Sequence, residues 1–304
     1  MFTGLLTIVT VPFVYWKLDN DVASARFLDE FERAQALERL RANQTGAGSR
    51  DFKWKHVVEA ALDVKTYLFI GLSLGSNLGA QVTNTFGPLI LKNFGFDKYK
   101  TSLLNMPFGA IQYIVILVVA YAAVKFRWKS ITLGIILMPI LTGLAMLYAL
   151  PRNHTAPLLV GYYLLAFIFG CNTLIVSWIL ANTAGQTKKS AMISLYNAAA
   201  SAGNIIGPLL FSSSDAPAYR PGLRKTLGVF AMMICVTILQ VVNLVFLNRL
   251  QEKRRVRNGK PAKIHDHSME ERYVSINADN DATIGNMAFA DLTDRENDEF
   301  VYVY

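Results

Sequence analysis

The chain has 304 residues, of which 53% are apolar and only 17% are charged, with a formal net charge of +8. A soluble domain carries about 25% charged residues, and here the charges lie between long uncharged stretches, which excludes an ordinary soluble domain. The basic residues flank apolar segments instead of forming one basic surface. This arrangement argues against a nucleic-acid partner and for a lipid bilayer.

Seven segments are almost free of ionisable side chains and predict an all-α, polytopic membrane protein. An α-helix needs roughly 20 residues to cross the hydrocarbon core, and lipid cannot satisfy the open backbone groups of a non-helical segment. The seven predicted spans are Met1–Trp16, Thr66–Leu91, Thr101–Val124, Ile131–Leu150, Pro157–Ala181, Ser190–Phe211 and Thr226–Leu247.

The chain begins with the segment 1–16 and the polar loop 17–65. The first segment is short for a span and starts without a polar flank, so we interpret it as a partial or full transmembrane helix, shortened by truncation or by a wrongly assigned start codon. It lacks a basic n-region and a small-residue cleavage site, which argues against a signal peptide. Apolar residues recur at helical spacing in the loop and predict an amphipathic helix over 27–41 on the membrane surface, which stops near Gly46.

The next six spans form one bundle over 66–247, and a tail over 248–304 ends the chain. The tail is first basic and then acidic, and its low apolar content predicts that it is largely disordered. Of the 30 Lys and Arg residues, 23 lie in the loop 17–65, in 125–129, in 188–189 and in the tail, against 7 on the opposite side. This sorting places the loop and the tail in the cytosol, and we expect the plasma membrane.

The predicted spans hold no Asp, Glu, Lys, Arg or His, so they carry no obvious proton relay. Two of them carry polar stripes, which are Asn77, Gln81 and Asn84 in the second span and Asn197, Ser201 and Asn204 in the sixth. Small residues occupy the opposite face of each helix. Such helices suit a wet cavity on one side and close packing on the other. The residues leave open a second interpretation, in which the amides only form interhelical hydrogen bonds.

The second span also carries a predicted interruption. In Asn84-Thr-Phe-Gly-Pro88 the proline removes a backbone donor and the glycine permits bending, and interrupted helices often line transporter substrate sites. Tyr162 and Tyr163 are interpreted either as site residues or as interfacial belt residues. The candidate substrate-binding residues are Asn77, Gln81, Asn84, Phe86, Gln112, Asn172, Ser177, Asn197, Ser201 and Asn204.

Several motifs together resemble one transporter family, over nearly the whole chain. The stretch from Phe27 to Glu38-Arg-Leu-Arg-Ala-Asn-Gln-Thr-Gly46 is similar to the central-loop signature of the fungal allantoate permease-like transporters, the anion:cation symporter family of the major facilitator superfamily. Further similar motifs are Thr83-Asn-Thr-Phe-Gly-Pro-Leu-Ile90, Gly161-Tyr-Tyr163, Ala184-Gly-Gln-Thr-Lys-Lys189, Gly203-Asn-Ile-Ile-Gly-Pro208, Asp215-Ala-Pro-Ala-Tyr219 and Asp291-Leu-Thr-Asp-Arg-Glu-Asn297.

This resemblance implies a secondary active transporter of twelve helices. Its substrates would be small organic anions such as allantoate, nicotinate, other vitamins or small peptides, moved together with protons. The resemblance also implies that this chain is the C-terminal part, beginning in family helix six and continuing through family helices seven to twelve. Helices one to five, and the proton-coupling groups that they carry, would then be missing.

Two other functions stay open at this point. Seven predicted spans with an outside N-terminus and an inside tail also fit a seven-helix receptor, although the long loop and the motifs argue against it. The short first segment also fits a non-functional fragment of a transporter gene. An enzyme is not expected, because no nucleophile–base pair, metal cluster or phosphate loop is recognisable. Cys171 and Cys235 have no metal-binding spacing and are interpreted as packing residues, so we expect neither a cofactor nor a metal.

Overall fold

The structure is a computed structural model of the chain, and it is all-helical in the residues that it describes, as the apolar segments predict. The described residues are 2–19, 22, 25–41, 51–87, 91, 97–126, 128–151, 153–216, 218–264, 287 and 290–304. The α-helices are α1 (Phe2–Lys17), α2 (Glu30–Arg41), α3 (Trp54–Leu62), α4 (Val64–Gln81), α6 (Lys98–Phe126), α7 (Lys129–Ala149), α8 (Thr155–Leu164), α9 (Ile168–Ala181), α10 (Gln186–Leu209) and α11 (Arg220–Arg257). The short helices are the π-helix η1 (Val82–Phe86) and the 3-10 helices η2 (Leu165–Phe167) and η3 (Ser213–Asp215).

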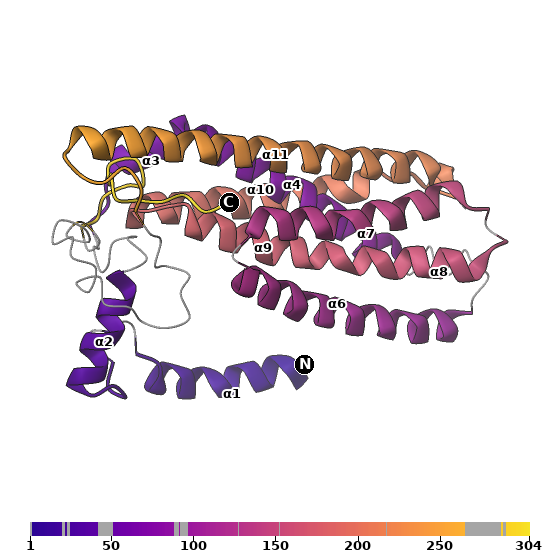
Figure 1. Ribbon diagram of the computed structural model, residues 1–304. Helices are drawn as coiled ribbons and strands as arrows, with labels where there is room; N and C mark the ends of the chain where they lie inside the picture. Colours follow the sequence, from indigo (N-terminus) through magenta and orange to yellow (C-terminus); the bar gives the residue numbers. More distant parts are fainter. Residues whose placement is uncertain are drawn as a thin grey trace.

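The long helices from α4 to α11 run back and forth as one bundle (Figure 1). Within the described part of the chain, four stretches are long and apolar enough to cross a membrane, namely Tyr99–Phe126, Lys129–Ala149, Thr155–Ala181 and Arg220–Arg257. The helices α4 and α10 pack against each other in the same bundle, and their amides and serines make them less apolar. These features are those of an integral membrane protein.

One end of the bundle gathers α3, the first turns of α4 and α10, and the C-terminal segment 290–304, and we call it the tail end. The loop 17–65 reaches the tail end through Lys53 and Lys55, which contact Asp291 and Glu296. The loop and the C-terminal segment therefore lie at the same end of the bundle, as the charge sorting predicts for two segments on one side of a membrane. The opposite end, which carries η3, is called the far end.

The helix α2 begins at Glu30 instead of the predicted Phe27. Asp29 explains the difference, since its carboxylate accepts from the Glu30 N–H at 2.7 Å while its own N–H donates to Glu32 at 3.1 Å. The bond from the Asp29 N–H to Glu32 is one half of a capping box, and the Asp29 carboxylate satisfies the first N–H of the helix. The predicted stop near Gly46 lies outside the described residues, and the amphipathic role of this helix stays a prediction.

The helix α3 was not predicted, and Asp63 separates it from α4. The Asp63 side chain accepts from the Lys65 N–H at 3.1 Å, so this residue ends α3 and caps the first turn of α4. Acceptors at this position satisfy backbone donors that a helix leaves open. The cap sets where the second predicted span starts.

The tail differs most from its prediction. The helix α11 continues to Arg257, past the predicted span end at Leu247, and residues 290–304 pack against the tail end with Phe300 and Tyr302 buried. The expectation of disorder is therefore wrong for 290–304, because partners elsewhere in the chain neutralise its charges. Residues 265–286 lie outside the described part.

Candidate functional site

The polar stripes lie on two helices that approach each other very closely. A Cβ atom at Gly203 of α10 would lie 2.6 Å from the Leu74 carbonyl oxygen of α4, and one at Gly207 would lie 2.8 Å from the Gln81 Cβ. Only glycine permits this approach, because the obstructing atoms are close to or part of the α4 backbone. On its other side α4 packs on α11, where Gly79 faces Phe230. The predicted small-residue faces are thus packing faces.

Three side chains from three helices form a group that we call the amide cluster: Asn77 of α4, Asn172 of α9 and Tyr196 of α10. The Asn77 Nδ2 donates to the Asn172 Oδ1 at 3.1 Å, and the Asn172 Nδ2 donates back at 3.4 Å. The Tyr196 hydroxyl donates to the same Asn172 oxygen at 3.3 Å. Asn77 is only 9% exposed. These amides satisfy one another, which favours the interhelical interpretation for Asn77 and Asn172; substrate binding by them stays a prediction.

The stripe on α10 has the opposite character, since its residues are exposed. Asn197, Ser201 and Asn204 are joined by Ser190 and Ser194, which are also exposed and continue the same face at spacings of three and four residues. Five small polar side chains therefore form one line along a helix that otherwise exposes Leu and Ile. Lipid is a poor neighbour for such a line, so it is suited to face water or a polar partner.

The α4 stripe meets the α10 stripe through its second member. The Gln81 Nε2 donates to the Asn204 Oδ1 at 3.2 Å, and Asn84, one turn further along the chain, is exposed. Asn84 lies within η1, where the α-helix changes to a π-helix at Val82–Phe86, which is the place of the predicted interruption. Single π-turns inside helices occur frequently at functional sites. Pro88 lies outside the described residues.

The remaining candidates lie apart from this meeting point. Gln112 on α6 and Ser177 on α9 are half-buried, and among the hydrogen bonds of the described residues none joins either side chain to the amide cluster. The side chain of Phe86 lies outside the described residues. Tyr162 is buried and donates to Asn105 at 2.8 Å, and Tyr163 donates to the Leu104 carbonyl at 3.0 Å, so both hold α8 against α6.

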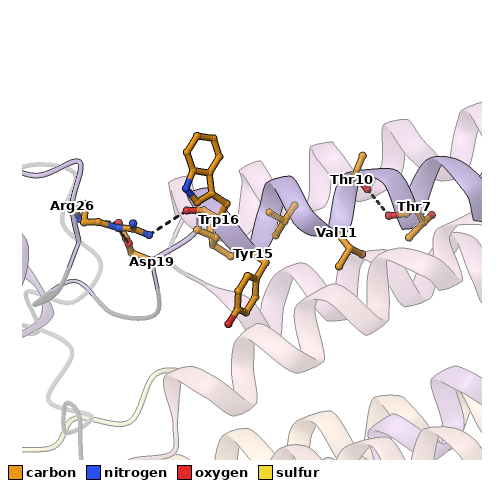
Figure 2. Close-up of a pocket in the computed structure, with 9 residues that line it drawn as sticks. Thr7, Thr10, Val11, Tyr15, Trp16, Asp19 and Arg26 are labelled. Atoms are coloured by element: carbon orange, nitrogen blue, oxygen red, sulfur yellow. Dashed lines mark hydrogen bonds and ion pairs between the residues drawn. The ribbon is translucent and has the colours of Figure 1, made fainter.

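A separate hollow of about 980 Å³ lies beside α1 (Figure 2). Its lining residues are Thr7, Thr10, Val11, Val14, Tyr15, Trp16, Leu18, Asp19 and Arg26. An ion pair of 2.8 Å between Arg26 and Asp19 closes one side, and Arg26 also donates to the Trp16 carbonyl at 3.2 Å. The hollow is formed by α1 and the turn after it and shares no lining residue with the polar stripes.

The bundle of apolar helices with an uncharged polar face is a carrier-like arrangement, and a comparison with known families decides its relationship. The family model described as Major Facilitator Superfamily matches residues 1–208. The chain belongs to this superfamily. Its helices α4 and α10 are therefore parts of a facilitator bundle, and the family match does not support the seven-helix receptor.

Curated relatives of this facilitator are fungal transporters. The chain is 35% identical over 99% of its length to the MFS-type transporter cnsL of Penicillium expansum, 30% identical over 100% to a thiamine pathway transporter of Saccharomyces cerevisiae, and 28% identical over 99% to the allantoate permease of Saccharomyces cerevisiae. It covers 58%, 54% and 53% of the lengths of these relatives, which is little more than half. No solved structure matches the chain.

Sequence reasoning missed three polar residues, namely Ser190 and Ser194 of the α10 stripe and Tyr196 of the amide cluster. The two serines were detectable, because they extend the spacing of Asn197, Ser201 and Asn204 backwards along the helix. Tyr196 was not, since its partner Asn172 lies on α9, and no local pattern shows which helix a tyrosine hydroxyl will reach.

Proposed function

We propose that this facilitator is part of a secondary active transporter of small organic anions, and that the exposed stripe of α10, together with Gln81 and Asn84 of α4, lines the substrate path. The observation that carries the proposal is the line of five exposed polar side chains from Ser190 to Asn204 on a membrane helix. Uncharged donors of this kind can bind a carboxylate by hydrogen bonds without a counter-charge.

The proposal of an organic anion substrate and of proton coupling rests on the relatives and on the motifs. One relative is named an allantoate permease, and the spans predicted from the sequence hold no Asp, Glu, Lys, Arg or His for a proton relay. Proton coupling would then depend on helices that this chain does not contribute. Facilitator-type carriers place substrate between two half-bundles, which agrees with a path along the open face of α10.

The stripe can be tested on the chain itself by cysteine labelling in membranes. We expect Asn197→Cys to react with a hydrophilic thiol reagent, because the side chain faces water. Leu195→Cys is the matched control: it lies at the same depth and points about 160° away around the helix, towards apolar surroundings. Equal labelling of the two positions would show that the stripe does not line an aqueous path.

Transport itself requires an uptake assay in yeast cells that lack their own allantoate and nicotinate carriers. We expect no uptake of either labelled anion by the chain alone. Uptake should appear when the chain is co-expressed with the part of the allantoate permease that it does not match, and should fall when the medium is made alkaline. Absence of uptake in the paired cells, with both parts present in the membrane, would favour a non-functional fragment.

We further propose that the tail end faces the cytosol and that the membrane is the plasma membrane. The support is the sorting of 23 basic residues against 7. A cysteine replacing the exposed Lys253 on α11 should stay unlabelled by an impermeant reagent in intact cells and become labelled after permeabilisation. Labelling in intact cells would reverse the orientation.

A further inference from the structure

The C-terminal segment 290–304, which we call the tail clasp, lies against the tail end of the bundle, with turns at 294–296 and 298–299 and no turn over 300–304 (Figure 1). It is rich in charged residues, yet Asp294 is 0% exposed, Thr293 is 0% exposed and Tyr302 is 2% exposed. A solvated acidic tail does not bury its carboxylates. The bundle must therefore provide specific partners for the polar groups of this segment.

Two asparagines bind the backbone of the clasp as a neighbouring strand would. Asn182, at the end of α9, accepts from the Val303 N–H at 2.8 Å and donates to the Val303 carbonyl at 2.9 Å. Asn248 of α11 does the same with Tyr302, at 2.8 Å in both directions. The Trp178 indole is a second donor to the Val303 carbonyl, at 2.8 Å. Backbone recognition of this kind is how grooves bind extended peptides.

The specific anchor of the clasp is Asp294. Its Oδ2 lies 2.5 Å from the Lys65 Nζ of α4, and its Oδ1 lies 2.8 Å from the Lys188 Nζ of α10. The Tyr302 hydroxyl donates to the same carboxylate at 2.9 Å, and the Ala184 N–H donates to it at 3.3 Å. All three charged side chains are 0% exposed. One tail carboxylate thus bridges the two helices that carry the polar stripes.

The Asp294 carboxylate completes a buried network in which it shares Lys65 and Lys188 with two carboxylates of the bundle, Glu59 and Asp63. Lys188 also pairs with Glu59 at 2.8 Å and with Asp63 at 3.3 Å. Lys65 donates to the Asn182 carbonyl at 2.6 Å and lies 3.7 Å from Asp63, so within the described part of the chain Asp294 is its nearest carboxylate. Burial opposes the ionisation of Asp294, but the two lysines outweigh it and hold the pKa of this carboxyl well below its usual range. Burial also raises the pKa of Tyr302, helped by the nearby Asp294 charge, so its hydroxyl stays a donor.

We propose that the tail end is a binding groove for an acidic peptide, and that its resident ligand is the chain's own segment 290–304. Asn182 and Asn248 bind the peptide backbone, and Lys65 and Lys188 bind the peptide carboxylate. Occupation fixes the ends of α4, α9, α10 and α11 relative to one another. The clasp is exchangeable: a peptide of the same sequence displaces it. This inference does not depend on which substrate the facilitator carries.

Cross-linking in the full chain tests whether the clasp is docked. The exposed pair Lys55 and Glu296, whose charged atoms lie 2.6 Å apart, is replaced by Lys55→Cys and Glu296→Cys in a chain with Cys171→Ala and Cys235→Ala. A short bis-maleimide should join the two cysteines within one chain. No product would show that the clasp is not docked there, and a dimeric product would show that a second copy's tail occupies the groove instead.

Substitutions then test the anchor. Adding Asp294→Asn should lower the cross-link yield at least about fivefold, because it leaves two buried lysines underpaired. Asn248→Ala should lower the yield as well, without changing any charge. Asp215→Asn, the same chemical change at the far end, should leave it unaltered. An unchanged yield with Asp294→Asn in chains that elute as monodisperse protein would remove the anchor from the proposal.

Competition by free peptide tests exchange. A tethered segment competes at an effective concentration on the order of 1 mM, so a synthetic peptide of residues 290–304 is added at several millimolar. We expect this peptide to reduce the intramolecular cross-link and the same peptide carrying Asp294→Asn to have no effect. If neither peptide reduces it, the segment is a permanent part of the fold and the groove is not an exchangeable peptide site. If both reduce it equally, the carboxylate is not what the groove recognises.

Discussion

The tail end and the amide cluster stabilise their buried polar groups by different interactions. At the tail end, three acidic side chains, Asp63, Asp294 and Glu59, meet Lys65 and Lys188 in a dense ion-pair network. The amide cluster between α4, α9 and α10, by contrast, consists of the uncharged side chains Asn77, Asn172 and Tyr196. A buried charge is tolerated where opposite charges and hydrogen-bond partners surround it, and it is costly in the hydrocarbon core of the membrane. The comparison predicts that damage at the tail end will be large and pH-dependent, and damage in the amide cluster small and independent of pH.

The largest effect should come from Asp294→Asn in the full chain. Removing one partner of a buried ion pair typically costs about 3–5 kcal/mol. Here the loss leaves Lys65 buried with Asp63 at 3.7 Å, while Lys188 keeps Glu59 and Asp63. We expect a clear fall of the apparent melting temperature in detergent, followed by tryptophan fluorescence in a chain in which Trp16, Trp54 and Trp128 are replaced by Phe, so that the signal comes from Trp178, which hydrogen-bonds the clasp. Lys55→Ala is the control: its ion pair with Glu296 is exposed and should contribute nothing measurable. Equal shifts for the two variants would contradict the contrast between buried and exposed pairs.

The second effect tests whether backbone packing, more than hydrogen bonding, holds the two stripe helices together. Gly203→Leu places a side chain against the Leu74 carbonyl of α4, which cannot move aside, and overpacking costs about 1–3 kcal/mol or more. The folded yield on size exclusion should fall strongly. Gly134→Leu on α7, where a Cβ meets nothing within 4 Å, should be tolerated. A normal yield for Gly203→Leu would mean that α4 and α10 do not approach each other this closely in the membrane.

The third effect is a pH dependence confined to the tail end. The pKa of Asp294 is lower in the folded chain than its ordinary value of 3.8. The contribution of this carboxylate to the free energy of unfolding is therefore present above pH 3.8 and is lost as the pH falls towards the folded-state pKa. At alkaline pH the two lysines oppose each other. For Lys188 burial opposes the charge, but Asp294, Asp63 and Glu59 outweigh it and raise the pKa, whereas burial lowers the pKa of Lys65, so we predict no net alkaline loss from this network.

We therefore expect stability to be level above about pH 5, with a loss of about 1 kcal/mol per pH unit below about pH 4. Melting curves recorded across this range check it. In Asp294→Asn the acid limb should flatten, because the titrating group is gone. An identical acid limb in the variant and the unaltered chain would assign the titration to other carboxyls.

The contrast also explains how much the sequence could predict. The spans and both stripes follow from patterns within one helix, because apolar length and three- and four-residue spacing are local properties. The tail clasp does not, since Asp294 pairs with a lysine 229 residues earlier in the chain. Composition treats the charges of 290–304 as solvated and predicts disorder, and only the fold reveals that the lysines are buried partners. For the same reason the sequence could not separate the bonded Asn77 from the exposed Asn197.

The smallest effect distinguishes the bonded amides from the exposed ones. Asn77→Ala, Asn172→Ala and the double variant form a cycle, and interhelical polar pairs in membranes couple by about 0.6 kcal/mol and at most about 1.7 kcal/mol. We expect a coupling of this size in thermal stability, with little further effect on ligand affinity.

Asn84→Ala and Asn197→Ala should instead change substrate affinity and not stability, measured in cells in which uptake has been restored. Their stability should stay normal, because these side chains are exposed. Substrate affinity should fall about tenfold or more, since a buried polar group of the ligand loses its partner, at a cost of about 1–3 kcal/mol. If Asn197→Ala instead lowers stability and leaves affinity unchanged, the α10 stripe contacts protein, and the proposed path does not run along it.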